Sequence, residues 1–252
     1  MKRTLAIGDI HGGFKALKQI IKRIRLNEDD TLIFLGDYVD GWSESAQVIH
    51  YLIKLSITHN CIFIKGNHDV WCEEWLRSGK TEPVWLAHGG KETIESYANY
   101  SLSQKRQHLN FFERMKLYHL DEQKRLFLHA GFTSMHGVER ETFKENFYFD
   151  RTLWEMAMIA DKQVDIDAVN YPNRLKHYSE IYIGHTPTIN FDSQNPMNAF
   201  NVWNIDTGAA FTGKLSAIDI NTKAIFQSEQ VMTFYPEESG RNEISYQKRN
   251  QF

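Results

Sequence analysis

A short apolar run followed by a polar, glycine-containing turn recurs in this sequence, and it is the feature that most constrains the fold. Three such pairs follow one another: 5–7 with 8–13, 31–35 with 36–40, and 61–64 with 65–69. Helical patterns over 14–25 and 43–55 separate them, and Ser43 is the expected N-cap of the second helix. Alternating strands and helices at this spacing predict a parallel sheet. The polar turns would then meet at the carboxyl ends of its strands.

The rest of the chain continues the pattern and then changes character. Two further apolar runs, 125–128 and 181–183, end at His129 and His185. Later short runs predict an antiparallel second sheet packed on the first; they are 202–205, 215–220 and 224–227. We expect one domain over 1–236, with a mostly helical and aromatic insertion at about 70–120 beside the site. The segment 237–252 is a polar C-terminal tail without periodicity, which is typical of a poorly ordered segment.

Composition excludes several classes of protein. The formal net charge of −3 argues against a general nucleic-acid binder or a basic membrane-surface protein. Cys61 and Cys72 are the two cysteines and form no CxxC pair, so neither a disulfide framework nor a thiolate zinc site is expected. No apolar run reaches the length of a membrane span, and the apolar stretch before Gly8 is too short for a signal peptide. We therefore expect a cytoplasmic protein without membrane partners.

The side chains at the predicted strand ends are of types that bind divalent metal ions. Carboxylates and imidazoles suit Mn, Fe or Zn. Two ions about 3.5–4 Å apart need a bridging oxygen donor, and Asp37, on the second of the first three strands, is the expected bridge. The expected ligands are Asp9, His11 and Asp37 for one ion, and Asp37, Asn67, His129 and His185 for the other. An amide oxygen at Asn67 keeps the site positive enough to hold a phosphate.

The motifs together resemble those of the calcineurin-like metallophosphoesterase superfamily, and within it the phosphoprotein phosphatases and their bacterial relatives. In chain order they are Gly8-Asp9-Ile10-His11-Gly12, Gly36-Asp37-Tyr38-Val39-Asp40, Gly66-Asn67-His68-Asp69, His129-Ala130-Gly131 and Gly184-His185-Thr186. Pro187 stands where many other branches carry a second His. The resemblance covers about residues 4–220. It implies an α/β fold, namely a four-layer α/β/β/α sandwich of two mixed sheets.

The resemblance also implies a mechanism. Two divalent ions, with Mn²⁺ expected first and Fe or Zn as alternatives, would occupy the ligand set given above. Metal coordination would make a water nucleophilic at neutral pH. His68 stands at the position of the general acid that protonates the leaving oxygen, and Asp40 would hold its other ring nitrogen.

One departure from the family pattern concerns the phosphate. The phosphoprotein phosphatases usually continue the second motif with Arg-Gly, and that Arg grips phosphate oxygens, but here Gly41-Trp42 follows Asp40. Asn67 and Arg151 are the expected phosphate-binding residues, the latter because related bacterial enzymes place such an Arg in this region. The alternative is that Arg151 only pairs with a surface carboxylate.

Several other residues allow two interpretations. The tryptophans Trp42, Trp71, Trp75 and Trp85 either pack the helical insertion, which we favour, or form a platform for a nucleobase. The segment 85–90 with Thr93 is expected to form a wall near the substrate entrance. A pocket-lining position for His88 is left open, whereas His136 is expected at the surface. Asp206 either approaches the metals or belongs to a turn, and Asp69 is expected to be structural.

The leading functional hypothesis is therefore an enzyme, a metal-dependent phosphoesterase. Its expected substrate is a phosphate monoester, such as a serine/threonine phosphoprotein, attacked by a metal-bridging water. The alternative is a hydrolase of dinucleoside polyphosphates, which related bacterial enzymes cleave and which a base-stacking insertion would favour. A catalytically silent metal-bound interaction module is a third hypothesis, disfavoured because His68 and Asp40 are both present.

Overall fold

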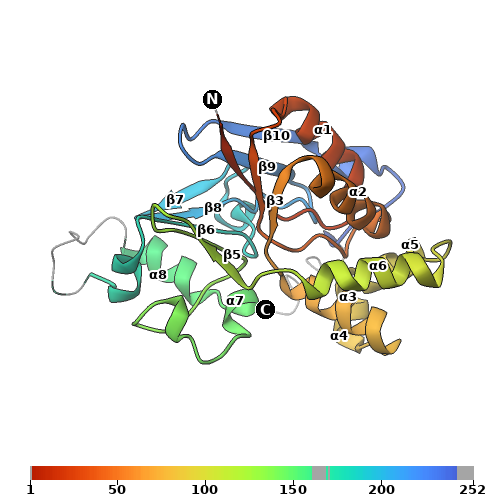
Figure 1. Cartoon of the computed structure of the whole chain (residues 1–252), viewed down its shortest axis with the longest axis horizontal. Coiled ribbons are helices and arrows are strands. Elements are labelled where there is room, and N and C mark those ends of the chain that lie inside the picture. The colour runs from red at the N-terminus through yellow and green to blue at the C-terminus, as the bar shows by residue number, and fades with distance from the viewer. Residues whose placement is uncertain (1, 161–168, 170, 243–252) are drawn as a thin grey trace.

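The computed structural model describes residues 2–160, 169 and 171–242. Two five-stranded mixed sheets lie face to face, with α1 and α2 over one and α7 and α8 beside the other (Figure 1). This arrangement confirms the predicted fold class. None of the described helices combines the length and the apolar character needed to cross a membrane.

The first sheet has the strand order β10-β9-β1-β2-β3. Its parallel strands are β1 (Thr4–Ile7), β2 (Thr31–Phe34) and β3 (Asn60–Phe63), connected by helices α1 (Phe14–Ile24) and α2 (Ser45–Thr58). Strands β9 (Lys214–Asp219) and β10 (Ile225–Gln230) add antiparallel to β1. The 3₁₀ turn η5 (Val231–Phe234) follows β10. The strand–helix alternation of the first 63 residues is thus the one predicted from sequence.

The second sheet has the order β4-β5-β6-β8-β7. Its strands are β4 (Tyr118–Leu120), β5 (Arg125–Leu128), β6 (Glu180–Ile183), β7 (Met197–Ala199) and β8 (Val202–Asn204). The three central strands β5, β6 and β8 are parallel, and the edge strands β4 and β7 are antiparallel to their neighbours.

Helices fill the connections. Those of the predicted insertion form a lobe at one side of the molecule (Figure 1): α3 (Asn67–Ser78), α4 (Pro83–Trp85), η1 (Leu86–Gly90), α5 (Lys91–Ser96) and α6 (Leu102–Glu113). Those of the second half are η2 (Val138–Arg140), α7 (Asn146–Phe149), α8 (Thr152–Ala160), η3 (Asn173–His177) and η4 (Thr188–Phe191). The helical character predicted for 137–169 is met by η2, α7 and α8, and residues 161–168 lie outside the described part of the chain.

Three apolar cores separate the four layers: one lies between the two sheets, and one lies between each sheet and its helices. Alternate residues of a strand face opposite sides of its sheet. Leu5 and Ile7 of β1 accordingly pack under α1 and α2, whereas Ala6 faces the second sheet. In β5, Phe127 joins the core between the sheets, whereas Leu126 and Leu128 pack with α8. Each sheet therefore buries both faces, which explains the nearly continuous apolar runs in the sequence.

Two sequence-based expectations about these elements were wrong. The runs 215–220 and 224–227 do not form the second sheet but extend the first as β9 and β10, because β9 pairs with β1. The second sheet is instead formed around β5, β6 and β8. The sequence pattern assigned only the run of β8 to this sheet, and β8 is parallel to β6, not antiparallel as expected. Ser43 does not cap α2, whose N-cap position is Glu44; the Ser43 hydroxyl donates to Glu238 over 2.6 Å.

Candidate metal centre and phosphate pocket

The sequence-predicted ligands meet at the carboxyl ends of the parallel strands. Each of these side chains follows one of five strands and is at most 8% exposed: Asp9 and His11 after β1, Asp37 after β2, Asn67 after β3, His129 after β5, and His185 after β6. Three of them adopt a positive φ, His11 at 51°, Asp37 at 51° and His185 at 67°. That conformation is uncommon for residues other than glycine and concentrates at functional sites. Both sheets therefore contribute to a single buried cluster.

Asp37 lies at the centre of this cluster. Its Oδ2 is 3.6 Å from His11 Nε2 on one side and 3.3 Å from His129 Nε2 on the other. The groups that could hold an ion are Asp37 with His11 and His68, and Asp37 with His129 and His185. Asp9 Oδ2 lies 3.9 Å from His11 Nε2, and Asn67 Oδ1 lies 3.3 Å from His129 Nε2. Asp37 is thus the carboxylate common to both groups, as the predicted bridge requires.

Backbone carbonyls orient two of the imidazoles. The Nδ1 atom of His11 lies 2.8 Å from the carbonyl oxygen of Asp40, and that of His129 lies 2.8 Å from the carbonyl oxygen of Leu35. An Nδ1–H that donates to a carbonyl leaves the lone pair on Nε2, which is the ligating tautomer. In both residues the Nε2 atom is the one that faces Asp37.

The donor set fits two divalent cations. Asp9 Oδ1 and His185 Nε2 are buried and have no hydrogen-bond partner among the described residues, which is costly unless something else binds them. Burial raises the pKa of Asp9 well above its usual range, and the nearby Asp206 carboxylate raises it further. A cation between these groups removes both penalties, and imidazole with carboxylate and amide oxygen suits Mn, Fe or Zn.

The predicted general-acid pair is present in a buried network. Asp40 Oδ2 lies 2.7 Å from His68 Nδ1 and accepts a 2.7 Å hydrogen bond from the indole of Trp85. Asp40 Oδ1 accepts a 2.6 Å hydrogen bond from the Thr93 hydroxyl. Burial is the largest influence on both titrating groups: it raises the pKa of Asp40 to about 8 and lowers that of His68 to about 3. The Nδ1 side of His68 is therefore held, and its Nε2 is left for a ligand.

The 85–93 segment has a second role besides the one predicted. We expected it to form a wall near the substrate entrance, and in addition Trp85 and Thr93 donate hydrogen bonds to Asp40. Within the segment, His88 lines the pocket.

Asp69 shapes the loop between the two central motifs, as expected for a structural residue. Its carboxylate accepts hydrogen bonds from the backbone N–H groups of Gly66, Asp37 and Tyr38, at 2.8, 2.9 and 3.0 Å. Since Asp69 lies in the first turn of α3, the same carboxylate also caps that helix. The backbone around Asp37 is therefore fixed by a side chain that does not itself enter the ligand groups.

A pocket of about 230 Å³ opens above the cluster. Its buried lining residues are Asp37, Asn67, His68 and His185, and its half-buried or exposed lining residues are Trp71, His88, Phe149, Arg151 and Arg241. The rings of Trp71 and His88 are nearly parallel, at 3° with centroids 6.4 Å apart, and Phe149 lies 6.0 Å from Trp71. Arg151 is exposed, and its Nη1 lies 3.4 Å from the Thr186 hydroxyl. Below, the floor means the six predicted metal ligands together with His68, and the mouth means the five half-buried or exposed residues.

Arg241 is the site residue that the sequence analysis missed. It belongs to the predicted polar tail, which gave no periodic or motif signal. The only hint was indirect: Gly41-Trp42 replaces the expected Arg-Gly, so another base had to be sought. Residues 243–252 of the tail lie outside the described part of the chain.

The structure distinguishes the other open interpretations. Trp42, Trp75 and Trp85 pack within the fold, as favoured, whereas Trp71 reaches the pocket. His136 is exposed and lies away from the site, in a separate depression beside His177. Asp206 satisfies both alternatives, because it accepts a 2.9 Å turn hydrogen bond from the Gly208 N–H and also raises the pKa of Asp9.

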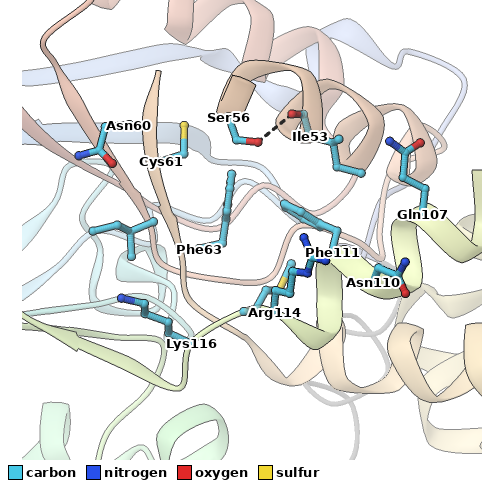
Figure 2. Close-up of a pocket in the computed structure, with 12 residues that line it drawn as sticks. Ile53, Ser56, Asn60, Cys61, Phe63, Gln107, Asn110, Phe111, Arg114 and Lys116 are labelled. Carbon is cyan, nitrogen blue, oxygen red and sulfur yellow. Dashed lines mark hydrogen bonds between the residues drawn. The ribbon is translucent and has the colours of Figure 1, made fainter. Parts of the chain in front are cut away.

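A larger cavity, of about 680 Å³, lies elsewhere, between α2, β3 and α6 (Figure 2). Phe63 and Phe111 form its apolar side, and the Ser56 hydroxyl donates to the Ile53 carbonyl within helix α2. Burial raises the pKa of the Cys61 thiol in its wall to about 12, so this cysteine is not an activated nucleophile. The lining residues therefore offer no reactive group, and we place the chemistry at the smaller pocket.

Comparisons with known proteins agree with this geometry. The chain is 28% identical over 250 residues to the asymmetrical bis(5'-nucleosyl)-tetraphosphatase PrpE of Bacillus cereus (strain Q1), covering 92% of this chain and 96% of that protein. A crystal structure of a putative diadenosine tetraphosphatase superposes with a TM-score of 0.61 at 16% identity, over 90% of this chain and 92% of that one. A serine/threonine phosphatase from Saccharomyces cerevisiae superposes with a TM-score of 0.59 at 15% identity, over 90% and 80%.

These two structural likenesses are evidence for the fold alone. The family is shown by a family model for the calcineurin-like phosphoesterases, which matches residues 2–207 and so spans all five strand-end motifs. This chain belongs to the calcineurin-like phosphoesterase family and is a metal-dependent phosphoesterase.

Proposed function

We propose that this enzyme hydrolyses dinucleoside polyphosphates, and that it cleaves a tetraphosphate asymmetrically into a nucleoside monophosphate and a nucleoside triphosphate. The single observation that carries the proposal is the composition of the pocket. Two Asp- and His-rich groups form its floor, while two arginines and three aromatic rings form its mouth. The relatives named as bis(5'-nucleosyl)-tetraphosphatases support the same choice.

The metal ions would be held by the six predicted ligands. Asp9, His11 and Asp37 would bind one ion, with Asn67, His129 and His185 completing the second site around Asp37. When bound, the two ions supply Lewis acidity at the phosphoryl oxygens and a water whose pKa is lowered toward neutrality. Mn²⁺ remains our proposal for the metal, with Fe and Zn as the alternatives.

His68 would act as the general acid. Asp40 holds Nδ1 at 2.7 Å, so Nε2 is the ring atom that can give a proton to the leaving oxygen. The oxygen of water forms the new bond to phosphorus, and the bond from phosphorus to the leaving oxygen breaks. Trp85 and Thr93 hold Asp40 against rotation, which keeps the imidazole of His68 in one orientation. Neither of these two residues lines the pocket.

The mouth is what favours a nucleotide over a phosphoprotein. A pocket of about 230 Å³ holds a phosphoryl group but not a whole dinucleotide, so a nucleoside would lie across the mouth. Trp71 and the 43% exposed Phe149 offer ring faces on which a base can stack. Arg151 would bind the polyphosphate chain, as predicted from the sequence.

A phosphate monoester, including a phosphoprotein, is the second candidate. The observation that favours it is that the floor alone provides everything needed at one phosphoryl group: the metal ligands and the His68–Asp40 pair. The sequence analysis preferred this substrate, but the arginine- and aromatic-lined mouth and the names of the relatives support it less than a dinucleoside polyphosphate.

A substrate panel tests the proposal. The protein, loaded with Mn²⁺, is assayed against diadenosine tetraphosphate, a set of phosphopeptides and p-nitrophenyl phosphate, and the nucleotide products are separated. We expect the highest kcat/KM for diadenosine tetraphosphate, with AMP and ATP as products. Two ADP molecules would contradict asymmetric cleavage, and a higher kcat/KM for a phosphopeptide would favour the second candidate. Absence of turnover with every substrate would favour the silent module.

A further inference from the structure

The loop after the second motif and the C-terminal segment fit against each other. Gly41 has a φ of +126°, which side chains rarely adopt, and a Cβ built there would lie 3.3 Å from the His11 carbonyl oxygen and 3.5 Å from Arg241 Cγ. The aliphatic stem of Arg241 therefore occupies the space beside Gly41. A Cβ at 41 would be in ordinary van der Waals contact with Arg241 Cγ, and the positive φ is what disfavours a side chain at this position.

Trp42 forms the surface on which this segment lies. Its indole donates a 2.8 Å hydrogen bond to the Ala209 carbonyl and stacks on Tyr235, with ring centroids 5.2 Å apart. A Cβ at Gly240 would lie 2.7 Å from the Trp42 ring, so the backbone just before Arg241 rests on the indole. Gly41 and Trp42, which stand where the family has Arg-Gly, thus form the surface against which the C-terminal segment packs.

Two further contacts hold the segment in place. Glu238 accepts hydrogen bonds from the backbone N–H and the hydroxyl of Ser43, at 2.9 and 2.6 Å. The backbone N–H of Arg241 donates to the Ala210 carbonyl at 2.9 Å, and its guanidinium carbon lies 5.3 Å from the Phe211 ring centroid. Arg241 is therefore tied at its backbone, while its side chain extends into the catalytic pocket.

The guanidinium has unused binding capacity at that place. Among the described residues, its buried Nε has no hydrogen-bond partner and no carboxylate forms an ion pair with the guanidinium. Burial lowers the pKa of Arg241, and the carboxylates of Asp37 and Asp40 act in the opposite direction. A buried guanidinium that is not neutralised by a paired carboxylate favours an anion, and phosphate offers the matching fork of oxygens.

We propose that Arg241 is a phosphate-binding residue of the active site, supplied from the C-terminal segment and seated by Gly41, Trp42 and Ser43. This inference rests on the proposed phosphohydrolase function of the same pocket, and it names the group that grips the substrate phosphoryl oxygens. Arg241 would supply the phosphate-binding guanidinium that the family carries directly after Asp40, although it lies 200 residues after Gly41 in the sequence. The ligand chemistry is that of a phosphate anion, whichever molecule carries it.

The test measures binding of inorganic phosphate to the Mn²⁺-loaded protein by calorimetry. In the Arg241→Gln variant we expect affinity to fall about 10- to 100-fold, as when a hydrogen bond to a charged group is lost. The KM for p-nitrophenyl phosphate should rise by a similar factor, and the bound metal should stay at the level of the unsubstituted protein. Arg241→Lys keeps the charge but not the fork, and should retain part of the affinity. Arg114→Gln, at the larger cavity, is the matched control and should change neither quantity.

A second variant tests how the residue is positioned. Glu238→Gln weakens the contact with Ser43 without touching the pocket, and should lower phosphate affinity by a smaller factor than Arg241→Gln. Unchanged phosphate affinity in Arg241→Gln would overturn the proposal, and so would a loss of bound metal that accounts for the weaker binding. Because the ligand here is inorganic phosphate, failure to cleave diadenosine tetraphosphate would leave this result standing and would count only against the proposed substrate.

Discussion

The floor and the mouth of the catalytic pocket are built in different ways. Every predicted metal ligand lies within four residues of the end of a strand, and backbone carbonyls orient the rings of His11 and His129. At the mouth, Trp71 and His88 come from the helical insertion, Phe149 from the end of α7, Arg151 from the turn that follows it, and Arg241 from the C-terminal segment.

This difference separates chemistry from substrate choice. The floor residues are fixed by the hydrogen bonding of two sheets, so their geometry cannot vary without disturbing the core. The mouth residues lie on connections, which tolerate change. Substitutions at the floor should therefore abolish turnover of every substrate, and substitutions at the mouth should change which substrate is preferred.

The largest effect is expected at the floor. His129→Ala removes an imidazole that lies 3.3 Å from the shared Asp37 carboxylate, and we expect one metal equivalent to be lost and kcat to fall about 1,000-fold or more, for all substrates. Metal analysis and turnover in excess Mn²⁺ measure the two losses. His136→Ala, an exposed histidine away from the site, is the control. Near-normal turnover in the metal-replete assay would contradict the ligand assignment.

An intermediate effect is expected at His68, the floor residue that is not one of the predicted metal ligands. His68→Asn should keep both metal ions and slow esters with poor leaving groups by about 100- to 10,000-fold, with a much smaller loss for p-nitrophenyl phosphate. The reason is that a good leaving group needs no proton in the transition state. The rates are compared across a series of aryl phosphates. If all leaving groups were slowed equally, His68 would not be the general acid.

The smallest effect is expected at the mouth, and it should be selective. Trp71→Ala removes a ring on which a base can stack, so KM for diadenosine tetraphosphate should rise about 5- to 100-fold. The KM for p-nitrophenyl phosphate should stay within about twofold, since that small ester needs only the floor. Trp71→Phe, which keeps an aromatic face, should restore most of the binding. Equal changes for both substrates would show that Trp71 supports the floor instead.

The floor was predictable because each of its parts is local. A buried strand followed by Asp, Asn or His can be recognised in a few residues, and parallel strands bring their carboxyl ends together. Asp9, His11, Asp37, Asn67, His129 and His185 all met where that logic placed them. The assignment of β9 and β10 to the first sheet was not predictable, because short strands carry no signal for the neighbour they will pair with.

The residues that hydrogen-bond to Asp40 could not be predicted from the sequence either. Trp85 and Thr93 bind that carboxylate from helices of the insertion, about 45 and 53 residues away in sequence. Nothing in the local pattern distinguishes such a tryptophan from one that only packs a core, because the distinction depends on where its indole N–H points.

By itself, the sequence determined the chemistry at the strand ends, since the identity and spacing of those residues follow from single strand–helix units. Only the tertiary structure decided that Arg241 enters the same pocket. Its position depends on Trp42, Tyr235 and Ala210 meeting across the two ends of the chain. Such a meeting is governed by the packing of the whole fold, and no short stretch of the sequence can encode it.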